Sequence, residues 1–228
     1  MPSADVIPFC VIPARAGSSR IPDKNLALVG GRTLLERAVG TAIEAFGTAF
    51  VSTDDERYAA VARAAGAHVP QLRPPELATD ESPVELALRA AYAAWADPGT
   101  QIVVVVQATS PFTTAADCLA TVAALQEHPA AGCAATVVRA QPTASFLLTE
   151  GPDGLATFLR PELAARRSQD LPSAWFLTGG VFALRSADLM AGRLVVSEPI
   201  VPVEVPAERA VDIDGHGDLA RARAWEPG

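Results

Sequence analysis

Two arginines and one lysine lie close together in a loop near the N-terminus of the chain. Arg15, Arg20 and Lys24 fall within residues 12–25, directly after an apolar run, and the loop is otherwise rich in small residues. Small residues let the backbone approach a polyanion with its amide groups, and the cations supply positive charge. The pattern indicates a phosphate-binding loop, although a solvated loop with scattered charges explains the composition equally well.

This loop matches neither of the common nucleotide-binding motifs. No glycine precedes Lys24 at the spacing of a P-loop, and Asn25 follows where that motif has Ser or Thr. A G-x-G-x-x-G dinucleotide fingerprint is also missing from the loop. Any nucleotide bound here would be held in a different manner.

A pair of carboxylates near the C-terminus suggests a metal site. Asp212 and Asp214 are separated by one residue, so a strand over residues 211–214 would place both on one face. Adjacent carboxylates repel each other unless a cation lies between them, and Mg²⁺ commonly takes one or two carboxylates together with substrate phosphates. A solvent-facing edge strand is an equally good explanation of this short motif.

Four further polar segments follow or interrupt apolar runs. Residues 52–55 carry two aspartates, either of which could cap the next helix, and residues 73–82 include an arginine that could face a base or phosphate. Residues 107–111 end a run of valines, at what would be the active-site edge of a sheet. Residues 166–170 hold two arginines and a glutamine, which suit an acidic substrate but also occur in solvated charge clusters.

Composition excludes several classes of protein. With 18 basic and 26 acidic side chains the net charge is −8, so no basic excess exists to neutralise a nucleic acid. Lys24 is the only lysine, which the substitution pattern of a GC-rich genome would explain by itself. Three cysteines without C-x-x-C spacing indicate buried thiols in a reducing cytosol. Without a basic leader or a long apolar run, the chain is expected to be soluble and cytoplasmic, with no membrane partner.

Apolar runs of strand length alternate with helix-length segments rich in Ala and Leu. The sequence predicts strands over residues 6–12, 50–52, 69–72, 101–107, 132–138, 181–184 and 200–205, and helices over 33–45, 55–65, 82–95, 114–127 and 217–225. Ser82 is expected to be the N-cap of its helix, with Pro83 at the first helical position. This order predicts one α/β domain over residues 1–228, with a mainly parallel sheet in three layers. Residues 139–176 are rich in Pro and Gly and predict an irregular arm with a hairpin.

The polar loops, taken together and in order, resemble those of the acylneuraminate cytidylyltransferases, the CMP-sialic acid synthetases. Each block is weak alone, but five in the right order over residues 8–220 are specific. The matching blocks are Ile12-Pro13-Ala14-Arg15 with Gly17-Ser18, Arg20-Ile21-Pro22 and Lys24-Asn25; Val51-Ser52-Thr53-Asp54-Asp55; Arg73-Pro74 with Glu76-Leu77-Ala78, Asp80 and Ser82; Gln107 with Thr109-Ser110-Pro111; and Asp212-Ile213-Asp214.

The resemblance implies a Rossmann-like nucleotidyltransferase fold and transfer of CMP from CTP to the hydroxyl of a 2-keto sugar acid, with release of pyrophosphate. It also implies Mg²⁺ as cofactor and a homodimer formed through the arm. Arg15, Lys24 and Asp212 would be catalytic, and Asp212 and Asp214 would hold the metal. The nucleotide would be bound by Ala14, Arg15, Gly17, Ser18, Arg20, Lys24, Asn25, Arg73 and Ser82, and the acidic acceptor by Gln107, Arg166, Arg167, Gln169 and Thr178.

Three departures from the family pattern fall on the acceptor side. Ala108 replaces a proline, and Thr178 and Phe182 stand where the family has Asn and Tyr. CTP is therefore expected as donor, whereas the acceptor could be another 2-keto acid sugar, a phosphonate or another non-sugar acid. A catalytically inactive nucleotide-binding regulator is a further alternative.

Overall fold

A six-stranded sheet forms the centre of the computed structural model, which describes residues 7–18, 20–140, 147–151 and 155–225. The strand order is β10-β6-β9-β5-β1-β4, with β1–β4, β1–β5 and β10–β6 parallel and β9 antiparallel to both of its neighbours. The bounds are β1 Phe9–Pro13, β4 Phe50–Ser52, β5 Ile102–Val106, β6 Cys133–Arg139, β9 Trp175–Arg185 and β10 Ile200–Glu204. The expected α/β class with a mainly parallel sheet is confirmed.

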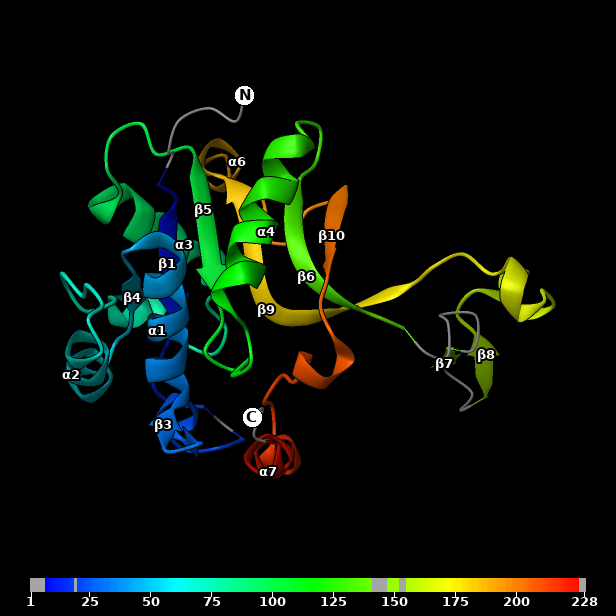
Figure 1. Cartoon of the computed structure of the whole chain (residues 1–228), viewed down its shortest axis with the longest axis horizontal. Coiled ribbons are helices and arrows are strands. Elements are labelled where there is room, and N and C mark those ends of the chain that lie inside the picture. The colour runs from blue at the N-terminus through cyan, green and yellow to red at the C-terminus, as the bar shows by residue number, and fades with distance from the viewer. Residues whose placement is uncertain (1–6, 19, 141–146, 152–154, 226–228) are drawn as a thin grey trace.

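Helices cover both faces of this sheet, which makes the three layers (Figure 1). One face packs against α1, α2 and α4, and the other against α3 and α6. The helices are α1 Leu34–Phe46, α2 Glu56–Ala64, α3 Val84–Trp95, α4 Ala115–Glu127, α5 Pro161–Ala164, α6 Ser186–Met190 and α7 His216–Ala224. Among the described residues, no helix has the length and apolar character needed to cross a membrane.

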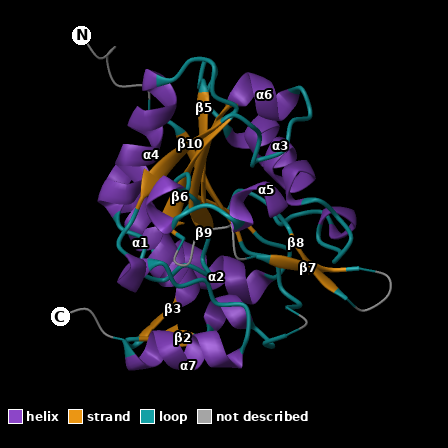
Figure 2. Cartoon of the chain, turned by 90° about the vertical axis from the view of Figure 1, so that its right-hand side faces the viewer, coloured by secondary structure: helices purple, strands orange, loops and turns teal. Residues whose placement is uncertain are grey.

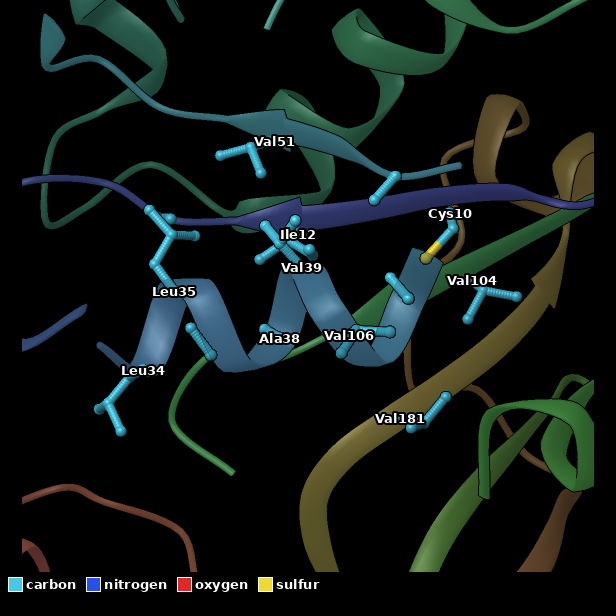
Figure 3. Packing of buried hydrophobic residues seen from close by; sticks show 14 of the residues in the cluster. Cys10, Ile12, Leu34, Leu35, Ala38, Val39, Val51, Val104, Val106 and Val181 are labelled. Atoms are coloured by element: carbon cyan, nitrogen blue, oxygen red, sulfur yellow. The ribbon is translucent and has the colours of Figure 1, made fainter. Parts of the chain in front are cut away.

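Alternation along the strands divides the core between the two faces. In β1, Cys10 and Ile12 face α1, while Phe9 and Val11 face the opposite layer. Figure 3 shows Ile12 of β1 next to Val39 of α1, and every side chain labelled there belongs to the core on the α1 face of the sheet. Both layers are apolar, so β1 and β5 read as continuous hydrophobic runs, as expected for strands buried on both faces.

The segment between β6 and β9 leaves the sheet as an arm. It contains a hairpin, β7 Leu148–Glu150 with β8 Ala156–Phe158, followed by α5 and a 3₁₀ turn over Ser168–Asp170. Figure 1 shows this arm extending to one side of the body, and in Figure 2, which looks at that side, β7 and β8 face the viewer. The predicted excursion with a hairpin is confirmed. Two parts of the predicted arm, residues 141–146 and 152–154, lie outside the described residues.

Two predicted strands are wrong. Residues 69–72 form no strand, and only His68 makes an isolated bridge to Phe50, because Pro70 and then Pro74 lack the N–H groups that would extend the pairing. Residues 211–214 are extended but join no strand, since the Ile213 amide donates instead to the carbonyl of Thr109 at 2.9 Å.

Other boundaries differ by a few residues. The helix expected from Ser82 begins at Val84, with Pro83 at the N-cap, so Ser82 does not cap it. Thr33 and Asp55 do cap their helices as side-chain acceptors. The strand predicted over residues 181–184 is the end of the longer β9, which is antiparallel because an arm rather than a crossover helix precedes it.

Candidate functional site

A polar pocket lies at the carboxyl ends of β1 and β5, where ligands bind in open α/β sheets. Its volume is about 290 Å³. It is lined by Pro13, Arg15, Ser18, Arg20, Lys24, Asn25, Gln107, Thr109 and Asp214. Seven of these nine are residues predicted for the site, and they come from three segments far apart in the sequence.

The loop after β1 is shaped by backbone contacts to the neighbouring strand end. The Ala14 amide donates to the Ser52 carbonyl at 3.0 Å, and the Ala16 amide donates to Oδ1 of Asp54 at 2.8 Å. These two amides therefore face the protein and not a ligand, which corrects the expectation that both could bind phosphate. Gly17 has a φ of 81°, a left-handed conformation that favours glycine.

Lys24 is the most enclosed of the pocket's cations. Its side chain is 15% exposed, and Nζ donates to the carbonyl of Ile213 at 2.8 Å and lies 3.5 Å from Oδ1 of Asp214. Arg20, at 68% exposure, lies 3.4 Å from the same oxygen. Arg15 pairs with Asp80 at 2.5 Å. Each cation of the pocket thus has a carboxylate partner.

Of the two candidate metal-binding carboxylates, Asp214 lines this pocket, whereas Asp212 is not part of the lining and lies against Gly179. The carboxylate of Asp212 lies so close to Gly179 that a Cβ atom added to this glycine would be only 3.0 Å from Oδ2. Gly179 has a φ of 74°, in the left-handed region that favours glycine. Desolvation of the Asp212 carboxyl raises its pKa, and the nearby Asp214 raises it further, while a hydrogen bond with Thr109 and the charge of Lys24 oppose the rise. The pair therefore lies close enough for a cation between the two groups to be stabilising.

The carboxylates of Asp212 and Asp214 fit the ligand preference of Mg²⁺. Within the described part of the chain, no group of three or more acidic, His or Cys side chains forms a complete metal site. Mg²⁺ usually keeps several waters and takes only one or two protein carboxylates plus substrate phosphates. Asp212 and Asp214 supply that number beside a pocket rich in cations.

An ion pair fastens the segment that carries these carboxylates. Arg209 makes a bidentate pair with Asp117 of α4 and donates to the carbonyl of Phe112 at 3.3 Å. Burial of the Asp117 carboxyl opposes its ionisation, but hydrogen bonds from Arg209 and Thr114 outweigh this, and the pKa lies below its usual value. Because Phe112 belongs to the loop after β5, the ion pair ties the C-terminal segment to that loop.

Two predicted nucleotide-binding residues lie behind the pocket rather than in its lining. Arg73 is buried, and its guanidinium donates to the Ser52 carbonyl at 2.6 Å and to the Ser52 hydroxyl at 3.1 Å. Burial, with the charge of Arg15, lowers the pKa of Arg73 to about 10, although the carboxylate of Asp54 opposes the shift. Arg73 therefore braces the strand end that anchors the loop. The Ser82 hydroxyl is enclosed and has no hydrogen-bond partner among the described residues.

The predicted acceptor-binding residues are divided between two places. Gln107 lines the pocket, and its backbone N–H donates to the Gly180 carbonyl at 3.0 Å. Thr178 is buried, and its hydroxyl lies 2.7 Å from that of Thr136, so it points into the sheet.

Arg166, Arg167 and Gln169 are exposed on the arm, which extends to one side of the body (Figure 1), and none of the three lines the pocket. The structure therefore does not bring these three residues to the pocket.

The departures from the family pattern also face inward. Ala108 is buried in the core beneath α1 and α4. Phe182 is buried in the core on the opposite face of the sheet. These substitutions therefore do not alter the lining of the pocket. They no longer support the expectation that the acceptor differs from that of the family.

Comparisons with known proteins agree with this geometry. A profile described as cytidylyltransferase matches residues 9–173. The chain belongs to the cytidylyltransferase family. The family predicted from the loop motifs is confirmed.

Several relatives of this family can be compared with the chain. It is 26% identical over 217 residues, 93% of its length, to an N-acylneuraminate cytidylyltransferase of Streptococcus agalactiae serotype V, of which the match covers 51%. It is 42% identical over 129 residues to a 3-deoxy-manno-octulosonate cytidylyltransferase of Xylella fastidiosa, covering 55% of this chain and 48% of that one. The chain thus spans about half the length of these curated relatives, or less.

Two solved structures share the fold of this chain. A CMP:2-keto-3-deoxy-manno-octonic acid synthetase complexed with CTP has a TM-score of 0.69 at 21% identity, over 95% of this chain and 96% of the other. A 4-diphosphocytidyl-2C-methyl-D-erythritol synthase from Anaerococcus prevotii has a TM-score of 0.66 at 16% identity, over 96% and 98%. At these identities the likeness shows the fold.

Sequence reasoning missed several residues that shape the pocket. Asp54 was considered only as a possible helix cap, yet it accepts from the loop backbone. Asp80 and Thr109 stand inside recognised motifs but were assigned no role. Arg209 had no local signal, because its partner lies 92 residues away.

We predict that Arg209→Gln lowers the free energy of unfolding by about 1–3 kcal/mol at pH 7. The lowered pKa of Asp117 means that the stabilisation is present above the unfolded-state pKa of about 3.9 and is lost as the pH falls through the lower native value. The difference between wild type and variant should therefore shrink below about pH 4. Urea unfolding at several pH values measures it, with the 75% exposed Arg221→Gln as control, expected within about 0.5 kcal/mol of wild type. A difference unchanged with pH would contradict the assignment.

Proposed function

We propose that this chain transfers the cytidylyl group of CTP to the hydroxyl of an acidic acceptor, a 2-keto sugar acid, and releases pyrophosphate. The observation that carries the proposal is the single pocket wall shared by Arg15, Arg20, Lys24 and Asp214, in a chain of the cytidylyltransferase family. Transfer at the α-phosphorus develops negative charge on the phosphate oxygens and on the leaving pyrophosphate. Fixed cations aimed at those oxygens are the main contribution that a protein can make to such a reaction.

The ligand-free arrangement suggests how the triphosphate would be received. Asp80 pairs with Arg15, and Asp214 is shared by Arg20 and Lys24, so the phosphates of CTP would take over positions now occupied by carboxylates. Lys24 would remain anchored through the Ile213 carbonyl while its ammonium turns toward a phosphate oxygen. Ser18 and Asn25 line the same wall and offer uncharged hydrogen-bonding groups.

Asp212 and Asp214 would hold Mg²⁺ in this proposal. When bound, the ion would neutralise phosphate charge and lower the pKa of a coordinated hydroxyl. The residues of the chain would orient the triphosphate, with Lys24 and Arg15 beside the leaving group, and Gln107 and Thr109 would face the acceptor at the end of β5.

The acceptor class follows from the relatives rather than from the three sequence departures. The curated relatives are named for N-acylneuraminate and 3-deoxy-manno-octulosonate. Both are 2-keto sugar acids, and the pocket is lined mostly by polar side chains, as such an acceptor requires. A phosphonate or another non-sugar acid is left as an outcome of the acceptor test.

The arm supports a homodimer as the working unit. Of the fifteen large apolar side chains exposed among the described residues, eight lie on the arm and its base: Leu147, Leu148, Leu155, Phe158, Leu159, Trp175, Phe176 and Leu177. An exposed apolar surface of this kind commonly marks a protein interface. In a dimer, Arg166, Arg167 and Gln169 of one subunit could reach the pocket of the other, which would reconcile their predicted role with their distance from the pocket of their own chain.

We expect pyrophosphate release from CTP, but not from other nucleoside triphosphates, in the presence of Mg²⁺ and a 2-keto sugar acid. An Asp212→Ala, Asp214→Ala double variant should lose about 100-fold or more in turnover, whereas Asp97→Ala, in an exposed loop, should retain it. A panel of sugar acids and phosphonates identifies the acceptor. CTP binding without turnover on any acceptor would instead favour the regulator, and unchanged activity of the double variant would contradict the metal assignment.

Lys24→Arg should reduce kcat/KM for CTP by about tenfold or more. The enclosed space between the Ile213 carbonyl and Asp214 suits a compact ammonium, whereas a planar guanidinium is larger and needs more room. Steady-state kinetics measures the loss, and Arg20→Lys serves as the matched control because that side chain is largely exposed. Near-normal turnover of Lys24→Arg would mean that the single lysine reflects genome composition alone.

Mixing two inactive variants tests the subunit arrangement. Lys24→Ala removes a pocket residue and Arg167→Ala removes an arm residue, so each homodimer should be nearly inactive. If the arm serves the partner's pocket, a randomly reassorted mixture restores about a quarter of the sites. Recovery is measured as pyrophosphate release after subunit exchange. No recovery, despite exchange shown by light scattering or mass spectrometry, would mean that the arm does not act across the interface.

A further inference from the structure

The residue before Lys24 adopts a conformation that its type rarely takes. Asp23 has φ 49° and ψ 38°, in the left-handed region, and it is the only non-glycine residue with positive φ among those the structure describes. For a residue with a side chain this conformation costs roughly 1 kcal/mol or more, although Asp and Asn tolerate it better than most. Such a residue persists where its surroundings hold it in place.

Helix α2 supplies that hold from outside the loop. NH1 and NH2 of Arg57 donate to the two carboxylate oxygens of Asp23 at 3.1 and 3.0 Å, and the Tyr58 hydroxyl donates to Oδ1 at 3.3 Å. The same guanidinium also contacts Asp55, the N-cap of α2, at 2.9 Å. Because Tyr58 is 1% exposed and Asp55 caps the helix, both partners are fixed by the body of the protein.

This network differs from an ordinary surface ion pair. Isolated exposed pairs contribute little, but a bidentate arginine shared between two carboxylates is a preorganised arrangement. The hydrogen bonds from Arg57 also hold the pKa of Asp23 below its usual value. The Asp23 carboxylate is therefore held at two points, and the backbone at that residue cannot relax without breaking the bidentate contact.

The turn at Asp23 directs the chain into the pocket. Lys24 begins a 3₁₀ turn over Lys24–Leu26, with the Leu26 amide donating to the Asp23 carbonyl at 2.8 Å. From there the Lys24 side chain reaches the Ile213 carbonyl. A relaxed backbone at Asp23 would re-aim the residue that follows it.

We infer that Arg57 is a positioning residue for the nucleotide site: by holding the left-handed turn at Asp23 it sets Lys24 for the triphosphate. Arg57 does not line the pocket and touches no pocket residue among the contacts described, so its effect passes through the Asp23 backbone. This inference rests on the proposed function, since it assumes that Lys24 binds the phosphates of CTP.

The test compares CTP affinity in variants that lack the Arg57–Asp23 contact or that change how easily residue 23 adopts positive φ. Arg57→Gln should weaken CTP binding roughly fivefold, measured by isothermal titration calorimetry with Mg²⁺ present. Adding Asp23→Gly should restore affinity to within about twofold of wild type, because glycine adopts positive φ without strain. Arg63→Gln, which removes an exposed pair with Glu56 from the same helix, should leave affinity unchanged.

A second pair keeps the test decisive if Arg57→Gln fails to fold. Asp23→Ala and Asp23→Gly both delete the carboxylate, but only alanine resists the left-handed turn, so alanine should bind CTP more weakly than glycine. Circular dichroism and thermal unfolding confirm that each variant is folded before titration. A purely stabilising role of Arg57 would lower the melting temperature without changing the affinity of the folded protein.

The outcomes separate the two levels of the proposal. Equal CTP affinity of wild type and Arg57→Gln, or equal affinity of the alanine and glycine variants, overturns the positioning role and leaves the proposed function standing. Failure of the wild-type chain to bind CTP at all overturns both.

Discussion

A hydrogen bond from Lys24 joins two segments at the candidate site that are far apart in the sequence. The ammonium of Lys24 donates to the carbonyl of Ile213, 189 residues later in the sequence. The amide of the same Ile213 donates to Thr109, at the end of the central strand β5. One residue, Ile213, therefore links the loop after β1, the loop after β5 and the segment that carries the two aspartates. A site at the edge of a parallel sheet is assembled from distant segments, and without such a cross-link the loops could move independently.

Charge at this site is balanced locally in a protein whose net charge is −8. Arg15, Arg20 and Lys24 form the cationic wall, and each has a carboxylate within 3.5 Å. An unpaired cluster of three cations would destabilise the folded chain through mutual repulsion. Nucleotide binding would thus replace carboxylates by phosphates as partners of these cations. This replacement limits the net electrostatic free energy gained on binding. The nearest carboxylates, Asp80 and Asp214, are already paired with cations, so their charges repel an incoming phosphate less.

Side-chain type and loop position were enough to predict the pocket wall, but pairings across the fold were not. Apolar runs place the strands, and the sheet topology then brings the polar residues at their ends together, which is why residues as distant as Arg15, Gln107 and Asp214 meet. The partners that fix their geometry carry no such local pattern. Ala16 depends on Asp54, and Asp23 depends on Arg57, each more than 30 residues away. The wrong strand prediction at residues 69–72 has a local cause. The composition of this segment suits a strand, but proline has no N–H group to donate to a neighbouring strand.

The irregularity of β9 connects the acceptor side of the site with the arm. Ala135 of β6 pairs with Phe182 and Val137 pairs with Leu177, so two steps along β6 correspond to five along β9. The surplus residues include Gly179 and Gly180, and the left-handed Gly179 leaves room for the carboxylate of Asp212. Beyond the bulge, β9 continues to Trp175, at the root of the arm. A side chain at Gly179 would disturb Asp212 and the direction of the arm together, because the same bulge seats the carboxylate and redirects the strand. The position of the Asp212 carboxylate and the direction of the arm therefore depend on the same irregularity of β9.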